Sequence, residues 1–449
     1  MRVAIVGAGG FRTPLIHGVL LDAQERLGIS EVVLHDDNAE RIRRIQPVLD
    51  GLAAERGRQL AVRVETDLDA AVSGARFVLC AIRVGGLAGR VVDETVPLEH
   101  GVLGQETVGP GGIAFALRTL PAMRRIAAAV ARHAPDGWLI NFTNPAGLVT
   151  EALQETLGER AIGICDSPDH LCREVADALE LPFDDLAFDY AGLNHLGWLL
   201  SARQAGRDLL PGLLADGERV ERLPAAELFG AGRLRELGAV PNEYLFYYER
   251  PQQAIDGFRR AGATRAQLLA AGQGSFYDAD PGDPRAAVRA WRRAVHSRNS
   301  SYMAEAREGE PPERPAEDED SPPTGGYEQA ALAAMDALEG VRPRVLILDV
   351  ANRGALPFLD RSAVVEVPAM IDRSGVRPLV TSEPPPDARR LMATVKDVER
   401  LTIRASAEGS RSLAVEALAL HPLVPSQAIA ERILAGYLER QPLLASLLG

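Results

Sequence analysis

The sequence contains little cysteine and more negative than positive charge. Three cysteines among 449 residues, Cys80, Cys165 and Cys172, are too few for a disulfide framework and favour a reducing compartment. Lysine and arginine total 49 against 62 aspartates and glutamates, and the resulting net charge of −13 argues against binding to a nucleic-acid backbone. An acidic surface still allows a few arginines to collect an anion in a pocket.

Long apolar runs and a secretory leader are also missing. No apolar run approaches the ~20 residues that a membrane-spanning helix needs. The chain opens on a predicted strand, Arg2–Val6, without a charged leader, an apolar stretch and a cleavage site. We therefore expect a cytoplasmic protein with no membrane partner. The motifs G-x-S-x-G, H-E-x-x-H and G-K-[ST] are absent, which disfavours serine esterases, zincins and P-loop enzymes.

The first 165 residues alternate between strand and helix patterns, which predicts a doubly wound parallel sheet. Predicted strands are 3–6, 31–36, 76–82, 138–141 and 161–165, and predicted helices include 13–27 and 119–133. Beyond Asn194 we expect an α+β region with helices near 222–238, 242–250, 264–271, 284–306, 327–338, 386–399 and 411–420. Apolar runs at 345–349 and 363–368 predict a small sheet inside this second region. We expect domains at 1–190 and 191–449, and the acidic, proline-rich segment 308–326 predicts a mobile surface loop.

A dinucleotide site is predicted at the first strand end. Gly7 and Gly9 match the first two glycines of G-x-G-x-x-G, whereas Arg12 replaces the third. Asp36 ends the next strand, where a carboxylate accepts hydrogen bonds from ribose hydroxyls and repels a 2′-phosphate, which favours NAD over NADP. Alternatively, Asp36 caps the following helix, a role for which Asp37 and Asn38 compete.

Cys165 and His195 are the second candidate constellation. Each follows an apolar stretch, and a thiolate with an imidazole favours a borderline-soft divalent metal ion in an open, catalytic site. The alternatives are a small buried Cys165, a turn histidine at position 195, or a cysteine nucleophile with His195 as its base.

Several ordered blocks resemble glycoside hydrolase family 4, especially its 6-phospho-β-glucosidase branch, over nearly the whole chain. The matching blocks are Gly7-Ala-Gly-Gly with Arg12-Thr-Pro14, Arg83-Val-Gly-Gly86 with Gly89-Arg90, His100 to Thr107, Gly109 to Gly112, Asn141 to Gly147, Gly163-Ile-Cys165, Gly192-Leu-Asn-His195, Pro241 to Tyr248 and His421-Pro-Leu423. This family is an NAD-dependent exception among glycosidases. The resemblance implies a lactate- or malate-dehydrogenase-like Rossmann domain, bound NAD and a divalent metal, for which we expect manganese.

Roles for individual residues follow from the same resemblance. It implies that Cys165 and His195 hold the metal, that Tyr244 is the base at sugar C2, and that Asp166 is the candidate acid. Substrate contacts are assigned to Arg90, Asn144 and Arg265, with the arginines near a 6-phosphate. We assign cofactor binding to Gly7, Gly9, Gly10, Phe11, Arg12, Asp36 and Arg83.

The expected reaction uses NAD as a transient hydride acceptor. NAD oxidises C3, which acidifies the C2 proton for removal; the leaving group departs from C1, water adds, and the hydride returns to C3. Hydrolysis of a 6-phospho-β-glucoside is the predicted outcome, by a homodimer or homotetramer. The alternatives are the other anomer, a non-phosphorylated sugar, a dehydrogenase of a hydroxy acid or sugar, and a non-catalytic NAD-binding protein.

Two positions depart from the pattern of the β-specific branch. Asp166 follows Cys165 where β-enzymes often carry Asn and α-enzymes Asp, and Thr324 stands where members often carry Arg. Asp166 can alternatively cap the next helix, and Tyr247 and Tyr248 compete with Tyr244 for the role of base. Arg90 can alternatively be a solvated surface residue. Asn141 and Asn144 can bind nicotinamide or sugar, or cap a helix.

Overall fold

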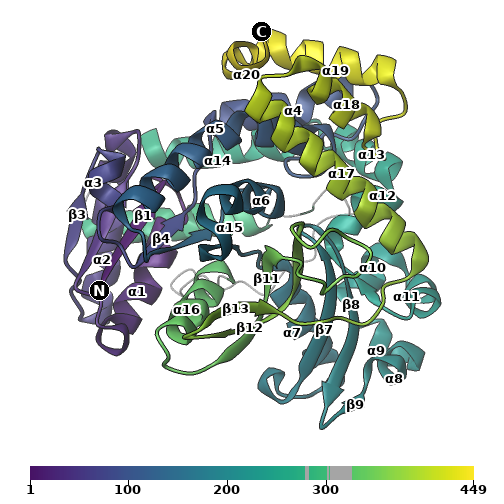
Figure 1. The fold of residues 1–449 in the computed structure, drawn as a ribbon, viewed down its shortest axis with the longest axis horizontal. Helices are drawn as coiled ribbons and strands as arrows, with labels where there is room; N and C mark the ends of the chain where they lie inside the picture. Colours follow the sequence, from purple (N-terminus) through teal and green to yellow (C-terminus); the bar gives the residue numbers. More distant parts are fainter. Residues whose placement is uncertain (279–282, 301–302, 304–325) are drawn as a thin grey trace.

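The computed structural model describes residues 1–278, 283–300, 303 and 326–449 (Figure 1). The predicted acidic loop 308–326, except for Gly326, and Thr324 within it therefore lie outside the described residues. In the described part, no helix has the length and apolar character needed to cross a membrane.

The first half of the chain forms the parallel side of one large sheet. Its strands lie side by side in the order β6-β5-β4-β1-β2-β3, all parallel, which is the order of a dinucleotide-binding fold. The strands are β1 Arg2–Val6, β2 Glu31–His35, β3 Val62–Val64, β4 Phe77–Cys80, β5 Trp138–Asn141 and β6 Ala161–Gly163. The helices of this half are α1 Thr13–Leu27, α2 Ala39–Arg56, α3 Leu68–Val72, α4 Gly86–Glu99, α5 Pro110–His133, α6 Ala146–Leu157 and α7 Ser167–Leu179, with 3-10 turns at Gly158–Arg160 and Phe183–Asp185.

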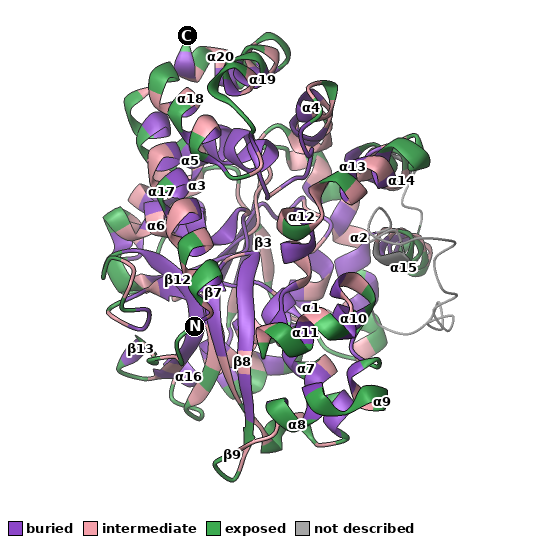
Figure 2. Ribbon diagram, turned by 90° about the vertical axis from the view of Figure 1, so that its right-hand side faces the viewer, coloured by how far each residue is buried: buried purple, intermediate pink, exposed green. Residues whose placement is uncertain are grey.

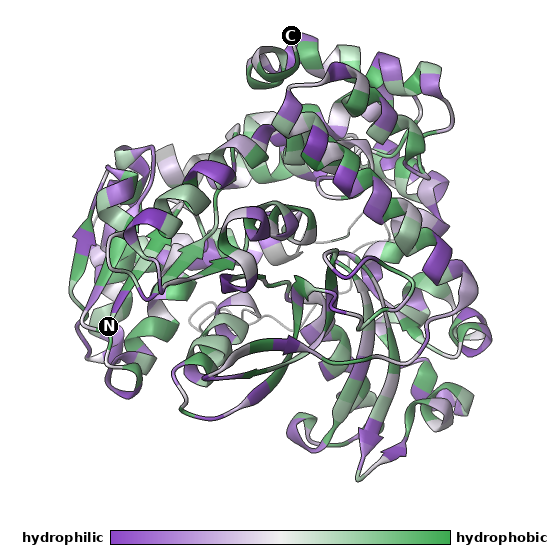
Figure 3. Cartoon of the chain, in the orientation of Figure 1, coloured by the Kyte–Doolittle hydropathy of each residue, from purple (hydrophilic) through white to green (hydrophobic). Residues whose placement is uncertain are grey.

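Alternating side chains of each parallel strand enter two different cores. Val3 and Ile5 of β1 join one core together with α1 and α2, whereas Ala4 and Val6 join another with α5 and α6. A strand buried on both faces needs apolar residues at consecutive positions, which explains the unbroken apolar runs of these strands. Figure 2 shows the strands mostly buried, apart from partly exposed ones such as β3, and Figure 3 shows hydrophobic residues along them.

The second half extends the same sheet with antiparallel strands. In the described residues the order continues from β6 to β11, β12, β7, β8 and β10, with β13 beside β12 and β9 beside β8, which makes thirteen strands. The prediction of a separate small sheet was therefore wrong, because β11 pairs with β6 of the first half and β12 pairs with β7, so both strands belong to the one large sheet. These strands are β7 Ala187–Leu193, β8 Leu196–Gln204, β9 Arg207–Asp208, β10 Val240–Pro241, β11 Arg344–Ala351, β12 Val364–Asp372 and β13 Gly375–Pro378.

Helices of the second half surround the sheet and the amino-terminal domain. They are α8 Leu210–Ala215, α9 Gly217–Val220, α10 Pro224–Phe229, α11 Ala231–Leu237, the 3-10 turn η3 Glu243–Leu245, α12 Phe246–Glu249, α13 Pro251–Ala261, α14 Arg265–Asp278, α15 Pro284–Ser300, α16 Tyr327–Leu338, α17 Pro386–Glu408, α18 Arg411–Leu420, α19 Gln427–Arg440 and α20 Pro442–Leu448. Helix α15 packs on α2 and α14 packs on α4, so these two helices of the second half lie against helices of the first half. Helix α5 begins at Pro110, nine residues before its predicted start.

Candidate active site

The glycine loop after β1 has the geometry of a nucleotide-binding turn. Gly7 has a φ of +88°, and a Cβ atom there would lie 2.5 Å from the carbonyl oxygen of Ala81, so only glycine fits. The backbone N–H of Gly9 donates to Asp36 Oδ2 over 2.9 Å. Asn38, rather than Asp36, caps α2 by accepting from two backbone N–H groups. The Asp36 carboxylate thus lies beside the glycine loop, as the sequence interpretation required.

Helices α14 and α15 hold this loop from outside. Tyr277 donates its hydroxyl to the carbonyl oxygen of Gly9 over 2.8 Å, and Trp291 Nε1 donates to that of Phe11 over 3.0 Å. The Phe11 ring is buried against Phe276 and Trp291. Only the backbone of Phe11 therefore remains in the loop to face a cofactor. Gly10 lies tightly against the carbonyl oxygen of Gly7.

His195 lies in the two-residue turn between β7 and β8, and its ring is fixed in one tautomer. The Thr107 hydroxyl donates to Gln105 Oε1 over 3.1 Å and therefore accepts from His195 Nδ1, 2.8 Å away. The proton on Nδ1 leaves Nε2 with the lone pair that a metal ion needs. Burial lowers the pKa of His195 to about 4, although Asp166 and Glu106 oppose this shift, so the ring is neutral at physiological pH.

Cys165 follows β6 as a buried thiol. Burial raises its pKa well above the usual range, and the charges of Glu366 and Asp166 raise it further. A thiol this difficult to ionise is a poor nucleophile, which disfavours the cysteine-nucleophile alternative, whereas a bound cation would stabilise its thiolate. Asp166 interacts electrostatically with both Cys165 and His195.

The donor set is suitable for an open metal site. Among the described residues no group of three or more His, Cys, Asp and Glu side chains could enclose an ion. Cys165 and His195 together offer one soft and one borderline ligand, which matches a catalytic site completed by substrate and water, not a closed structural one.

Tyr244 stacks face to face on His195. Their ring centroids lie 3.7 Å apart at an interplanar angle of 4°, and the Tyr244 backbone N–H donates to Asn242 Oδ1 over 3.0 Å. Of the competing tyrosines, Tyr248 stacks on His421, and Tyr247 is buried in the core with its ring centroid 6.0 Å from that of Tyr244.

Asp166 precedes α7 but does not cap it, because its side chain makes no capping hydrogen bond. The carboxylate instead interacts with Arg12, whose guanidinium lies 4.1 Å from the ring centroid of Tyr327. The Arg12 side chain therefore turns to the centre of the site. Asn141 closes the turn after β5 with bonds to Thr143, and Asn144 lies part-buried between β5 and α6.

Arg83, Arg90 and Arg298 act on one buried glutamate, Glu106, and Arg12 and Arg265 act in turn on Arg298. Glu106 pairs with Arg83 and with Arg90 Nη1, the latter at 2.8 Å. Burial raises the pKa of Glu106, but these cations outweigh burial and lower it to about 2. Arg90 Nε also donates to Glu94 Oε1 over 2.7 Å. Arg298 lies among them: burial lowers its pKa to about 9, and the cations of Arg12, Arg265 and Arg83 add to the decrease. We call Arg12, Arg83, Arg90, Arg265 and Arg298 the arginine cluster.

Helix α14 brings Arg265 to this cluster. The backbone N–H of Ala266 donates to Glu94 Oε2 over 2.8 Å, and Arg265 Nη2 donates to the carbonyl oxygen of Arg298 over 3.1 Å. Arg90 is 4 % exposed, so the solvated-surface alternative for it is wrong.

Four residues near the site had no role assigned from sequence. Glu106 and Thr107 fall in a block used for the family resemblance, and that block was the available signal. Arg298 and Tyr327 carried no local signal, because only the packing of α15 and α16 brings them to the site.

Comparison with known proteins decides the family. Residues 2–181 match the family model described as "Family 4 glycosyl hydrolase", and residues 190–424 match its C-terminal domain. This chain belongs to family 4 of the glycosyl hydrolases. The predicted resemblance is confirmed.

Family 4 relatives resemble the chain over almost its entire length. A maltose-6'-phosphate glucosidase of Bacillus subtilis is 30% identical, with 97% of this chain and 95% of the relative covered. A 6-phospho-beta glucosidase from Thermotoga maritima, solved with manganese, NAD+ and glucose-6-phosphate, has a TM-score of 0.82 at 27% identity over 98% of both chains. A 6-phospho-alpha-glucosidase from gut microorganisms, in complex with NAD and Mn2+, has a TM-score of 0.81 at 26% identity over 98% and 97% of the chains.

Family 4 chains share their fold with a dehydrogenase class. Malate dehydrogenase from Plasmodium falciparum is similar at a TM-score of 0.50 and 11% identity over 91% of this chain and 99% of that one. The predicted Rossmann-like, malate-dehydrogenase-like α/β fold is confirmed. The enzyme is a glycosidase by family, and its relatives include both α- and β-specific phosphoglucosidases.

Proposed function

We propose that this chain hydrolyses 6-phosphoglucosides with NAD and a divalent metal, preferably manganese. The arginine cluster is the observation that carries the proposal. Burial, and after it the repulsion from neighbouring cations, lowers the pKa of Arg298, and a dianionic phosphate bound among the guanidinium groups would relieve that repulsion. Relatives solved with glucose-6-phosphate, NAD and Mn2+ support the same ligands.

Cys165 and His195 Nε2 would hold the metal, and the glycine loop with Asp36 would hold the cofactor. When bound, NAD supplies reversible hydride acceptance at sugar C3, and the cation supplies positive charge beside the C2 and C3 oxygens. This chain's own residues perform the proton transfers. Arg83 follows β4 and pairs with Glu106.

Tyr244 takes the proton from C2 in this proposal. Its stacking on His195 fixes the phenol beside the metal ligand, and the cation of Arg90 is electrostatically coupled to it, which favours the deprotonated phenol. Asp166 gives a proton to the leaving oxygen, a role consistent with its lack of a capping bond. Arg90, Arg265 and Asn144 contact the sugar phosphate and hydroxyls.

The β-anomer is our first candidate for the scissile bond, as the sequence resemblance predicted. The α-anomer is the second, and Asp166 favours it because an acid at this position follows the pattern of α-specific members. Removal of the C2 proton is a step that both anomers share, so the catalytic residues above serve either one.

A panel of four nitrophenyl glucosides, α and β, each with and without a 6-phosphate, tests the proposal in the presence of NAD, Mn2+ and reductant. We expect hydrolysis of a phosphorylated substrate and, in deuterium oxide, one solvent deuterium at C2 of the product. Hydrolysis without C2 labelling would contradict the mechanism. Net accumulation of NADH would favour the dehydrogenase alternative instead.

A further inference from the structure

Glu366 is a buried carboxylate for which the proposed chemistry has no use. It lies in the middle of β12, opposite Asp349 of β11 and Gly192 of β7, and is 1 % exposed. Burial raises its pKa well above the usual range, and the neighbouring Asp349 raises it further. Burying two adjacent carboxylates is costly, so a protein that retains them needs a compensating interaction.

One oxygen of Glu366 supports the turn that carries His195. Asn194 Nδ2 donates to Glu366 Oε1 over 3.4 Å, while Asn194 Oδ1 accepts from the backbone N–H of Ala146 over 2.9 Å. Asn194 is thus held at both ends of its side chain. The next residue, His195, has a φ of +62°, a strained conformation for a residue with a side chain, which persists where the surroundings fix it.

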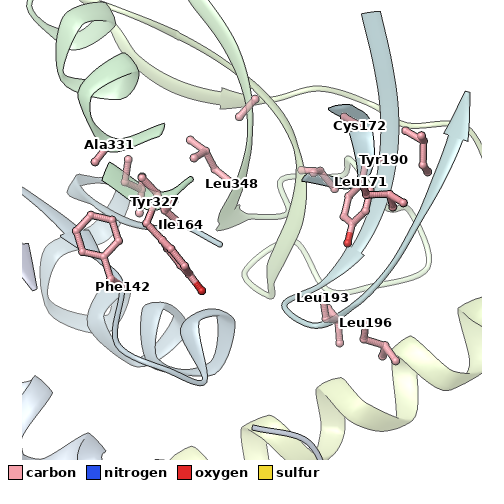
Figure 4. Packing of buried hydrophobic residues seen from close by; sticks show 14 of the residues in the cluster. Phe142, Ile164, Leu171, Cys172, Tyr190, Leu193, Leu196, Tyr327, Ala331 and Leu348 are labelled. Atoms are coloured by element: carbon pink, nitrogen blue, oxygen red, sulfur yellow. The ribbon is translucent and has the colours of Figure 1, made fainter. Parts of the chain in front are cut away.

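The other oxygen of Glu366 reaches Tyr244 through two side chains. The Tyr190 hydroxyl donates to Glu366 Oε2 over 3.0 Å and accepts from Asn242 Nδ2 over 3.4 Å. Asn242 Oδ1 in turn accepts from the backbone N–H of Tyr244. Figure 4 shows the Tyr190 hydroxyl directed toward the turn between Leu193 and Leu196.

A glycine makes room for this second branch. A Cβ atom at Gly197 would lie 2.2 Å from the Tyr190 hydroxyl oxygen, so the hydroxyl reaches Glu366 only because residue 197 lacks a side chain. The route from Glu366 to the hairpin and to Tyr244 is therefore built from four buried or part-buried polar side chains with defined partners.

We propose that Glu366 is a positioning residue that fixes the His195 turn and the Tyr244 backbone relative to each other. The inference rests on the proposed function, because it assigns to these two residues the metal and the C2 proton. Outer-layer partners of metal ligands commonly change metal affinity by about 10- to 100-fold when they are removed.

Cobalt binding to the purified full-length enzyme tests this role without turnover. Co2+ is titrated into wild type, Glu366→Met, Glu366→Gln and Asp349→Asn, and the thiolate–cobalt absorption gives each dissociation constant. Glu366→Met removes both acceptors and is expected to weaken Co2+ binding by about 10- to 100-fold. Glu366→Gln keeps one acceptor, so we expect a smaller loss, of at least about threefold, that partly rescues the Met variant.

Asp349→Asn is the matched control. It removes the other carboxylate of the same buried pair and relieves the same repulsion, but the Asp349 oxygens have no hydrogen-bond partner. We expect its Co2+ affinity to stay within about threefold of wild type. An equal loss of Co2+ affinity in Asp349→Asn and Glu366→Met would overturn the inference, because the loss would then come from changing either carboxyl of the buried pair and not from the hydrogen bonds of Glu366.

Unchanged affinity in Glu366→Met would also overturn the inference, and if that variant does not fold, unchanged affinity in Glu366→Gln decides in the same way. A positioning role further predicts a lower kcat for Glu366→Met with a KM for the 6-phosphoglucoside close to wild type, since the arginine cluster is untouched. If the wild-type enzyme shows no thiolate–cobalt bands, the proposed metal site itself is refuted, and this inference with it. If the wild-type enzyme shows the bands and the variants bind Co2+ equally well, only this inference is refuted.

Discussion

Replacing Asp349 by asparagine should stabilise the protein, and the gain should grow with pH. Asp349 is fully buried, and neither carboxylate oxygen has a hydrogen-bond partner. Burial raises its pKa from 3.8 to about 8, and Glu399 adds to the increase while Lys396 opposes it. The native state therefore holds a neutral carboxyl at pH 7, whereas the unfolded chain ionises it.

The size of the gain follows from this difference in proton binding. Between pH 3.8 and 8 the native state binds the additional proton, so the wild-type free energy of unfolding falls as pH rises. The loss amounts to about 2 kcal/mol at pH 5 and about 4 kcal/mol at pH 7. An asparagine cannot ionise in either state and resembles the neutral carboxyl in shape, so it avoids this loss.

Urea unfolding at pH 5 and pH 7 measures the gain. We expect Asp349→Asn to exceed wild type by about 1 to 2 kcal/mol at pH 5 and by about 2 to 4 kcal/mol at pH 7. Asp397→Asn, an exposed position on α17, is the control and should change stability by less than about 0.5 kcal/mol. A variant that is less stable than wild type, or a gain that does not increase with pH, would show that the buried carboxylate is ionised.

Three other outcomes follow from the contacts of the site. Thr107→Val removes the acceptor for His195 Nδ1–H, so Mn2+ affinity should fall by about 10- to 100-fold in a titration, and unchanged affinity would exclude the tautomer assignment. Arg298→Ala should raise the KM for a 6-phosphoglucoside by about tenfold or more. Arg293 is exposed on the same helix, so Arg293→Ala should leave the KM unchanged. Equal effects of the two variants would show that Arg298 does not bind the phosphate. Three buried histidines destabilise the protein in acid, because the unfolded chain binds their protons at a higher pH than the folded chain does. As pH decreases from 6.5 toward 4, each of them should lower the free energy of unfolding by about 1.4 kcal/mol per pH unit. His17→Leu should therefore remove about a third of the total slope in unfolding measurements. The histidines concerned are His17, His195 and His421.

The parallel half of the fold was predictable because its signals are local. Strands buried on both faces read as apolar runs, and the helix 13–27 was predicted with the bounds that α1 has. The place of β11 and β12 was not predictable, since an apolar run does not reveal its pairing partner. Strand β11 joins β6 through the bridge pair Asp349 with Gly163, and β12 joins β7 through the bridge pair Glu366 with Gly192.

Some residues of the candidate site were predictable from sequence and others were not, for the same physical reason. Gly7, Asp36, Cys165 and His195 follow strands, where sequence position and spatial position agree. Arg298 is part of α15, whose sequence resembles an ordinary basic helix, and only its packing on α2 brings that arginine to Arg12 and Arg265. No local signal marks Glu366 either, because the role of a glutamate inside an apolar strand depends on its hydrogen-bond partners, here Tyr190 of β7 and Asn194 of the following turn.

The order of strands in the sheet also determines when, during translation, the candidate site can form. Strand β6, which leads to Cys165, and strand β7, which leads to His195, follow one another in synthesis, yet β11 and β12 lie between them. A nascent chain that stops before residue 344 lacks the two strands that separate and align these ends. The thiol and the imidazole therefore reach their final arrangement late in translation, so truncated products should not capture the metal.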